Sequence, residues 1–373
     1  MKIVNRKFGY RKIVNRKFGY RKIVNRKFVN RKSLYILASL VVFLLTACDK
    51  VSPIGVLVSG TAVEDRVKMS HLFYQLHKGD YKAHDASELD EYTFLVGADS
   101  HLATDSGRMA EMLQNGLDHN DLLYAHLGDI ADTKPEYYIL LEEVIDSYKE
   151  KYAKKHFMEI DLDEVDASGH HSIFVDTLAG NSYFLDEITY PFYPVVGNHD
   201  ITHNGWALWS NIFHSSFYDV YVLVDKGKQY EDLVFDHFIF IDTASGTLGQ
   251  EQVRLINEGV LSSRQNEMYT VRNTFVFSHT NIFRPSSLQF SSTFTREESF
   301  FLLDKFRDWD AKIVFCGHVH KWDRQMVGGV EYLTLDSMSE RNSPDPGDYL
   351  VRVHVKKDGT VTWERVRMNY VAR

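Results

Sequence analysis

The sequence predicts an α/β fold whose polar residues gather along one edge of a sheet. Five apolar runs, rich in β-branched and aromatic residues, are typical of buried strands. They cover residues 92–96, 122–127, 193–196, 274–277 and 313–315. Segments with helical spacing lie between several of them, as in α/β proteins. Each run is followed by a short polar cluster, and the carboxyl ends of parallel strands meet at one edge of such a sheet.

The five clusters follow one another in a fixed order. They are Asp99-Ser100-His101, Gly128-Asp129, Gly197-Asn198-His199-Asp200, Ser278-His279 and Gly317-His318-Val319-His320. Their oxygen and imidazole donors suit divalent metals of intermediate softness. One such cluster would mean little, whereas five in order predict a metal site. The glycines are compatible both with turns after strands and with a close passage of the backbone past the metals.

Other segments fill in the architecture. Helical spacing predicts helices at 106–117, 136–155, 206–213, 250–261 and 297–309, and at 63–76, whose place in the fold stays open. Further strands are expected at 217–224 and 233–241, as a pair, and at 330–335, 349–355 and 360–367. The last two are predicted to form a hairpin with Gly359 at a positive φ. The acid-rich segment 157–170 predicts a surface loop, and 284–296 either a lip over the site or an ordinary loop.

These motifs resemble those of the calcineurin-like metallophosphoesterases, whose pattern is D-x-H, G-D, G-N-H-D/E, H and G-H-x-H. The match spans about residues 92–322. The resemblance implies a four-layer α/β/β/α sandwich with a dinuclear metal site at the carboxyl ends of the strands. It implies that one metal takes Asp99, His101 and His320, the other takes Asn198, His279 and His318, and Asp129 bridges them. The two divalent ions would be Mn, Fe, Zn or a mixed pair.

The expected reaction follows from this ligand set. Two cations about 3.5–4 Å apart can bind phosphate oxygens, acidify a bridging water and offset charge in the transition state. We therefore expect hydrolysis of a phosphomonoester or phosphodiester by attack of metal-bound hydroxide. The resemblance leaves His199 free of metal and implies that it protonates the leaving oxygen. Asp200, beside it, is expected to fix the tautomer of His199 and raise its basicity.

One departure separates the chain from the related purple acid phosphatases. They carry a Tyr three residues after the bridging Asp, where this chain has Asp132. They also have Gly at the position of His101. We therefore expect no Tyr–iron charge-transfer site.

The first 47 residues predict an export signal. A ten-residue unit that begins at Lys2 recurs, contributing 13 Lys and Arg to this segment, and an apolar run follows at 34–45. That run is shorter than the ~20 residues of a spanning helix and fits the apolar region of a signal peptide. Residues 45–48, Leu-Thr-Ala-Cys, resemble a bacterial lipobox, which implies cleavage before Cys48 and lipidation of that residue. An uncleaved membrane anchor is the alternative.

The expected organisation follows from these segments. Residues 1–47 form a lipoprotein signal peptide, 48–90 a tether and N-terminal segment, and 91–373 the metallophosphoesterase domain. The protein is expected in the bacterial cell envelope, lipid-anchored, with its catalytic domain outside the cytoplasm. With Cys48 lipidated, Cys316 is the only remaining cysteine, so no intrachain disulfide is expected.

Charge narrows the choice of partners. Removal of the 13 basic residues in 1–47 changes the net charge from −8 to −21. Such an acidic chain argues against broad nucleic-acid binding. A small phosphoester stays compatible because bound metals dominate the local field. No protein partner is inferred. Two alternatives remain: a catalytically idle surface lipoprotein that uses the fold for binding, and a nuclease of the same family.

Overall fold

The computed structural model describes the chain from residue 62 onward, with gaps. The described ranges are 62–76, 84–103, 106–132, 134–156, 158–160, 173–175, 182–184, 190–227, 233–261, 269–283, 294–339 and 349–369. They belong to one unit, Asp49–Arg373. The predicted signal peptide, Cys48, the tether and most of the segment 284–296 lie outside them. None of the described helices combines the length and the hydrophobicity that crossing a bilayer requires.

Five strands form the first sheet, in the order β15-β14-β2-β3-β7. Strands β2, β3 and β7 run parallel, and β14 runs antiparallel to both β2 and β15. Their bounds are β2 Glu91–Gly97, β3 Leu123–His126, β7 Phe192–Pro194, β14 Tyr349–Lys356 and β15 Val361–Arg367. The predicted strands and the C-terminal hairpin are therefore present.

The second sheet has seven strands, in the order β1-β8-β9-β10-β11-β13-β12. Strands β9, β10, β11 and β13 are parallel, and β8 and β12 are antiparallel to their neighbours β9 and β13. The bounds are β1 His84–Asp85, β8 Tyr218–Asp225, β9 Val234–Phe240, β10 Thr270–Ser278, β11 Ala311–Cys316, β12 Asp323–Val327 and β13 Val330–Thr334. The pairing predicted for 217–224 and 233–241 is confirmed, whereas β12 was not predicted.

A small antiparallel sheet stands apart from the two large ones. It consists of β4 Met158–Ile160, β5 Ile173–Val175 and β6 Ser182–Phe184. The prediction of a loop throughout 157–170 is therefore wrong at β4. The acid content that suggested a loop lies mostly after residue 160, whereas β4 forms by pairing with β5 later in the chain.

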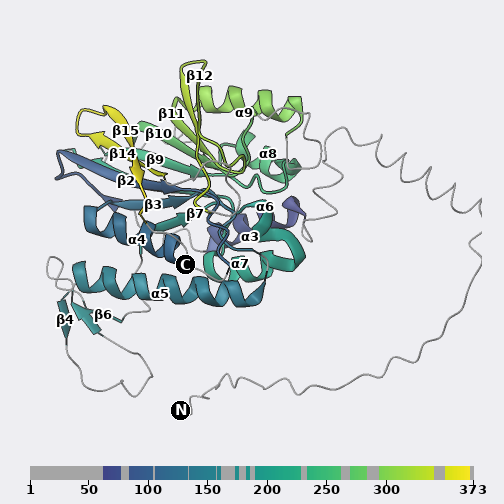
Figure 1. Cartoon of the computed structure of the whole chain (residues 1–373). Coiled ribbons are helices and arrows are strands. Elements are labelled where there is room, and N and C mark those ends of the chain that lie inside the picture. The colour runs from purple at the N-terminus through teal and green to yellow at the C-terminus, as the bar shows by residue number, and fades with distance from the viewer. Residues whose placement is uncertain are drawn as a thin grey trace, which may run out of the picture. The chain divides into compact units, whose positions relative to one another are not determined.

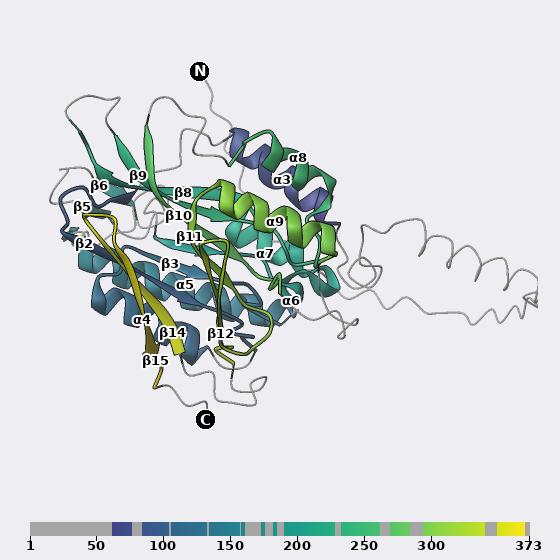
Figure 2. The same ribbon diagram turned by 90° about the horizontal axis from the view of Figure 1, so that it is seen from above.

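Helices cover the outer face of each large sheet (Figures 1 and 2). Packed against the five-stranded sheet are α4 Gly107–His119, α5 Pro135–His156, the short α6 Asn198–Ile201 and α7 Gly205–Phe213, with the 3₁₀ turn η2 Thr202–Asn204 between the last two. Packed against the seven-stranded sheet are α3 Val63–Leu76, α8 Gly249–Asn257 and α9 Arg296–Asp308. The predicted four-layer α/β/β/α sandwich is confirmed. Helix α8 ends before residue 261, since Gly259 follows with φ 76°.

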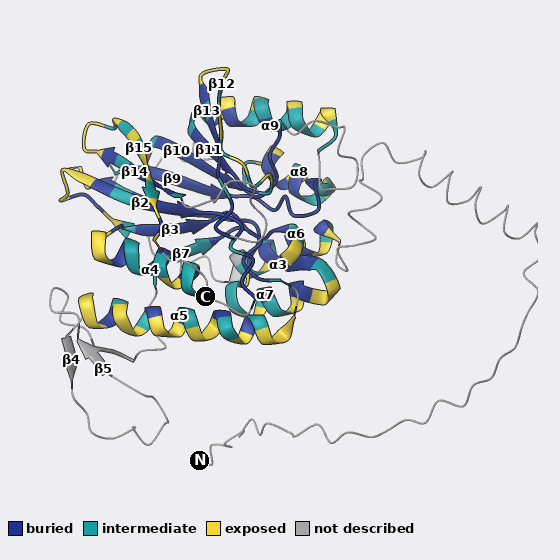
Figure 3. Cartoon of the chain, in the orientation of Figure 1, coloured by how far each residue is buried: buried dark blue, intermediate teal, exposed yellow. Residues whose placement is uncertain are grey.

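Aromatic rings fill the space between the two sheets. Phe94 of β2 lies 5.0 Å, between ring centroids, from both Phe238 of β9 and Phe275 of β10. On the other face of β2, Leu95 is fully buried beneath the helices. The central strands are thus buried on both faces (Figure 3), which explains their continuous apolar runs in the sequence.

Candidate metal centre

The loops that follow β2, β3 and β11 bring the first predicted ligand set together. Asp99, His101, Asp129 and His320 present ligand atoms that all lie within 4.8 Å of one another. The Nε2 atoms of His101 and His320 are 3.2 Å apart, and His320 Nε2 lies 3.4 Å from Asp99 Oδ1. This spacing suits donor atoms around one cation.

The second ligand set comes from the loops after β7, β10 and β11. His279 Nε2 lies 2.9 Å from Asn198 Oδ1 and 3.1 Å from His318 Nδ1. Asp129, His279 and His318 also present ligand atoms within 4.8 Å of one another. His279 Nδ1 lies 2.8 Å from the carbonyl oxygen of Leu127, so the Nδ1–H donates to it and Nε2 is left for a metal.

Asp129 lies between the two sets. Its Oδ2 is 3.8 Å from His101 Nε2 and 3.5 Å from His279 Nε2. Its Oδ1 accepts a hydrogen bond of 2.7 Å from the backbone N–H of His199. Oδ1 is therefore fixed by a backbone hydrogen bond, and Oδ2 faces both ligand sets.

The buried carboxylates of the site are ready to hold cations. Burial alone would favour the neutral acid, but the hydrogen bond with His320 and the charge of His279 hold the pKa of Asp99 below its usual range. For Asp129, likewise against the effect of burial, His279 and His101 lower the pKa. Two charged carboxylates among imidazoles and an amide oxygen form a donor set that fits Mn, Fe or Zn.

Five of the predicted ligands have left-handed backbone conformations. Their φ angles are 52° for Asp99, 42° for His101, 51° for Asp129, 67° for His318 and 55° for His320. Such conformations are uncommon for residues other than glycine and cost about 1–3 kcal/mol each. The rest of the fold must hold them in place, and they turn successive side chains toward one point.

Two glycines permit this close approach. A Cβ on Gly197 would lie 2.2 Å from Asp129 Oδ1, and a Cβ on Gly128 would lie 2.9 Å from His279 Nδ1. Gly128 also has φ 89°, which side chains disfavour. The glycines of the motifs therefore serve both as turns and as space for the ligands.

Asp132 lies in the site, although no role there was predicted for it. Its Oδ1 lies 3.3 Å from Nδ1 of His101 and 3.3 Å from Nδ1 of His199. Contact with Asp132 raises the pKa of His199 to about 9 in the metal-free chain. The two histidines in turn, His101 first, lower the pKa of Asp132. The only signal in the sequence was the position of Asp132, three residues after Asp129.

Asp200 does not contact the His199 ring as expected. Its Oδ1 accepts the N–H groups of Ile130 and Ala131, at 3.0 and 3.2 Å, and its Oδ2 accepts that of Gly197 at 2.8 Å. The predicted tautomer-fixing contact is therefore corrected, because backbone donors from two loops use both carboxylate oxygens. Asp132 makes the contact with the ring instead.

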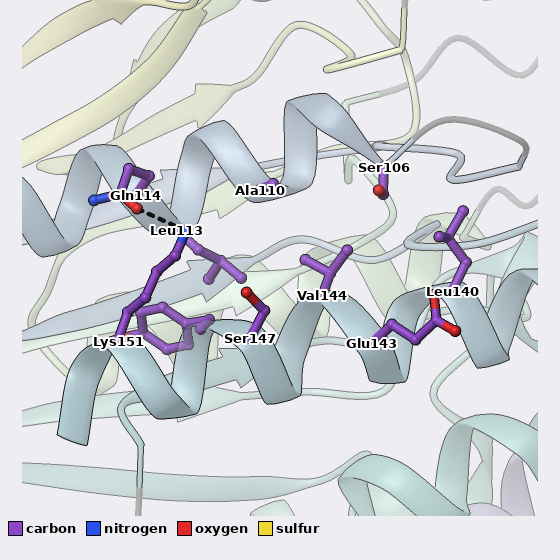
Figure 4. A pocket seen from close by; sticks show the side chains of 10 residues that line it. Ser106, Ala110, Leu113, Gln114, Leu140, Glu143, Val144, Ser147 and Lys151 are labelled. Atoms are coloured by element: carbon purple, nitrogen blue, oxygen red, sulfur yellow. Dashed lines mark hydrogen bonds between the residues drawn. The ribbon is translucent and has the colours of Figure 1, made fainter. Parts of the chain in front are cut away.

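A cavity of about 170 Å³ lies elsewhere, between α4 and α5 (Figure 4). Its apolar floor includes Leu113 and Val144, and a hydrogen bond from Lys151 to Gln114 crosses it. No predicted site residue lines it, so it is separate from the metal centre.

Sequence comparison identifies the family of this site. The model of the calcineurin-like phosphoesterase domain matches residues 92–322. The chain belongs to the calcineurin-like phosphoesterase family. It is therefore a metal-dependent hydrolase that acts on phosphoric ester bonds.

The solved structures that are similar to this chain are distant from it in sequence. GAP50, described as the anchor in the inner membrane complex of Plasmodium, is 12% identical over 75% of this chain and 90% of its own, with a TM-score of 0.43. A dimetal phosphatase from Danio rerio is 11% identical over 74% and 99%, with a TM-score of 0.37. TT1561 of Thermus thermophilus is 10% identical over 74% and 99%, with a TM-score of 0.38. No curated protein matches the chain in sequence.

Proposed function

We propose that this protein is a membrane-tethered phosphoesterase that uses two divalent cations to hydrolyse a small phosphomonoester or phosphodiester. The position of Asp129 supports this proposal most strongly. Its Oδ2 faces imidazoles of both ligand sets, at 3.8 and 3.5 Å. Two cations at this point would bind the phosphate oxygens and supply an activated water.

Individual residues of the chain have separate roles in cation binding and proton transfer. Asp129 and the ligands around it would hold the cations. His199 donates a proton to the leaving oxygen. When Nδ1–H of His199 faces Asp132, its Nε2 is the nitrogen that can reach substrate. The backbone N–H of His199 donates a hydrogen bond to Asp129, which links the position of the proton donor to that of the bridging carboxylate.

The tether and the location are part of the same proposal. The lipobox at 45–48 supports lipidation of Cys48, and the basic and apolar segments before it support export. The catalytic domain would lie in the bacterial envelope outside the cytoplasm. The metals are proposed as Mn, Fe, Zn or a mixed pair.

The competing functions are disfavoured by specific residues. An idle binding protein would have no need for all seven predicted ligands. Six of them lie in two groups whose ligand atoms are within 4.8 Å of one another, and the seventh, Asn198, contacts His279. A nuclease would benefit from a basic face, whereas the chain without residues 1–47 carries a net charge of −21.

The test combines metal content with turnover. The full chain is purified in detergent, its bound metals are counted by elemental analysis, and chromogenic phosphomonoester and phosphodiester substrates are assayed with added Mn²⁺. About two metals per chain, with turnover of either ester, is the expected result. Two metals without turnover would favour the idle binding protein, and a chain that binds no metal would overturn the proposal.

A further inference from the structure

Helix α3 differs from an ordinary surface helix because it buries polar side chains beside its valines and exposes large apolar ones. Such a helix normally buries an apolar stripe and exposes polar residues. Here Arg66 and Ser70 are fully buried, together with Val67, whereas Met69 and Leu72 are 51% and 60% exposed. This burial pattern explains why the helical pattern at 63–76 did not reveal the place of the helix in the fold.

The buried polar face fixes the helix firmly. Arg66 donates to Asp242 at 2.8 and 2.9 Å and to Ser245 at 3.0 Å. Ser70 accepts the backbone N–H of Ser216 at 2.8 Å. Because a buried arginine needs its paired carboxylate, α3 cannot roll to hide its apolar face without breaking this pair.

The outward face of α3 is defined here by Lys68, Met69 and Leu72, all exposed. Lys68 and Leu72 are one turn apart, so the three side chains share one side of the helix. Asp65, also exposed, lies one turn before Met69, so this face joins two large apolar groups to one cation and one carboxylate. A bilayer surface offers the matching combination, headgroups of both charges above acyl chains.

The tether decides between possible occupants. Only residues 49–61 separate the proposed lipidated Cys48 from the start of the described chain at Ala62, immediately before α3. Thirteen residues span at most about 45 Å, so the anchor keeps α3 near the bilayer. A second copy of the chain is a poorer fit, because two apolar side chains fall far short of the roughly 800 Å² per partner of a standard interface.

We propose that the outward face of α3 rests on the membrane to which Cys48 anchors the chain, and so sets the orientation of the catalytic domain. This inference rests on the tether in the proposed function. Met69 and Leu72 would enter the boundary between headgroups and acyl chains, a depth of about 5–10 Å. Lys68 would lie among the headgroups.

The test places an environment-sensitive label at single positions of the full lipidated chain. The variants Leu72→Cys, Ile139→Cys and Met326→Cys each carry a nitrobenzoxadiazole label. Ile139 on α5 and Met326 on β12 are matched controls, since both are large, apolar and exposed, at 57% and 61%. The native Cys316 is buried, and burial raises its pKa to about 12, so it reacts poorly with the label.

The labelled chains are reconstituted into vesicles of phosphatidylethanolamine and phosphatidylglycerol. Emission from position 72 is expected to shift to the blue and to be quenched by lipids with a nitroxide near the headgroup. Emission from positions 139 and 326 is expected to stay water-like. A water-like signal at 72 in vesicle-bound protein, or a response at 139 or 326 instead, would overturn the inference.

Flotation separates this inference from the tether. If the wild-type chain fails to float with the vesicles, the tether and the inference fall together. If it floats and position 72 stays in water, only the inference falls. As a second measurement, Met69→Gln with Leu72→Gln, labelled at Lys68→Cys, should float and lose the lipid quenching that the Lys68→Cys chain shows. Turnover of a soluble ester should not change, because these residues lie outside the metal centre.

Discussion

Buried carboxylates lie near both ends of the parallel strands, and the two ends balance their charge differently. Where β3 begins, Asp121 pairs with Arg352 at 2.9 Å. Where the strands finish, the ion-pair partners described for Asp99 and Asp129 are all histidines. The negative charge of Asp121 is balanced by Arg352, whereas the negative charges of Asp99 and Asp129 are left for cations to balance. At these two ends of the strands, the carboxylates with histidine partners belong to the metal centre, and the one with an arginine partner belongs to the scaffold.

The largest expected effect comes from Asp129→Asn. The amide keeps an oxygen for the His199 N–H but loses the charge that faces both metal sets. We expect metal binding to fail and kcat/KM to fall by at least about a thousand-fold, which corresponds to ~4 kcal/mol of lost transition-state stabilisation. Elemental analysis measures metal binding, and ester hydrolysis measures kcat/KM. A variant that retains two metals per chain would show that Asp129 does not bridge them.

An Asp-to-Asn change at the start of the strands should instead lower stability and leave metal binding intact. Asp121→Asn leaves Arg352 buried without its counter-charge, which is expected to cost about 3–5 kcal/mol of unfolding free energy. Urea unfolding of the metal-free chain measures this loss, and the folded fraction should still bind two metals. Metal-free Asp129→Asn should unfold no more easily than the metal-free wild type. If both variants lost stability equally, the contrast between the two ends would be wrong.

His199→Ala tests a residue at the metal end that binds no metal. Loss of a general acid is expected to lower kcat about 100-fold for esters with poor leaving groups. Esters of acidic phenols need less protonation, so they should lose much less. Metal content should not change. His119→Ala, on the exposed end of α4, serves as the matched control, and equal losses for both classes of ester would exclude the proton-donor role.

His84 is a half-buried titratable group whose side chain contacts a neutral hydroxyl and no counter-charge among those described. Its Nε2 lies 2.6 Å from the hydroxyl of Tyr193, and burial lowers its pKa to about 4. The folded state therefore prefers the neutral ring, and its contribution to stability is complete above pH 6.5 and is lost as the pH falls toward 4. Between pH 7 and pH 5, wild type should lose about 1–2 kcal/mol more than His84→Gln. Parallel pH profiles of unfolding would contradict this.

The sequence predicted the metal centre better than its surroundings. Each ligand follows an apolar strand, and local sequence governs both the strand and the turn after it. The set could therefore be assembled from five local signals. Asp132 could not be found this way, because its two partners approach it from separate loops. The tautomer-fixing contact expected of Asp200 was wrong for the same reason, since adjacency in sequence did not mean contact between the side chains, although the charge of Asp200 does contribute to the raised pKa of His199.

Prediction of the fold from the sequence was also limited to features that local sequence determines. Strands buried on both faces, such as β2, were predictable from continuous apolar runs. Strand β12 was not, because it lies at the edge of its sheet and most of its residues are exposed. The burial pattern of α3 depends on Asp242, which lies 176 positions after Arg66. No periodicity within the helix can report such a partner.

The hydrogen bonds of Asp200 have a consequence for how the protein acquires its metals. They clasp the loop that carries Asp129 to the loop that carries Asn198, without using any metal ligand. Because these contacts involve no cation, they can hold the two loops together before metals bind. Under the proposed export of the chain, the site would close first and take up cations afterwards. The supply of metals in the receiving compartment then helps to decide which ions it carries.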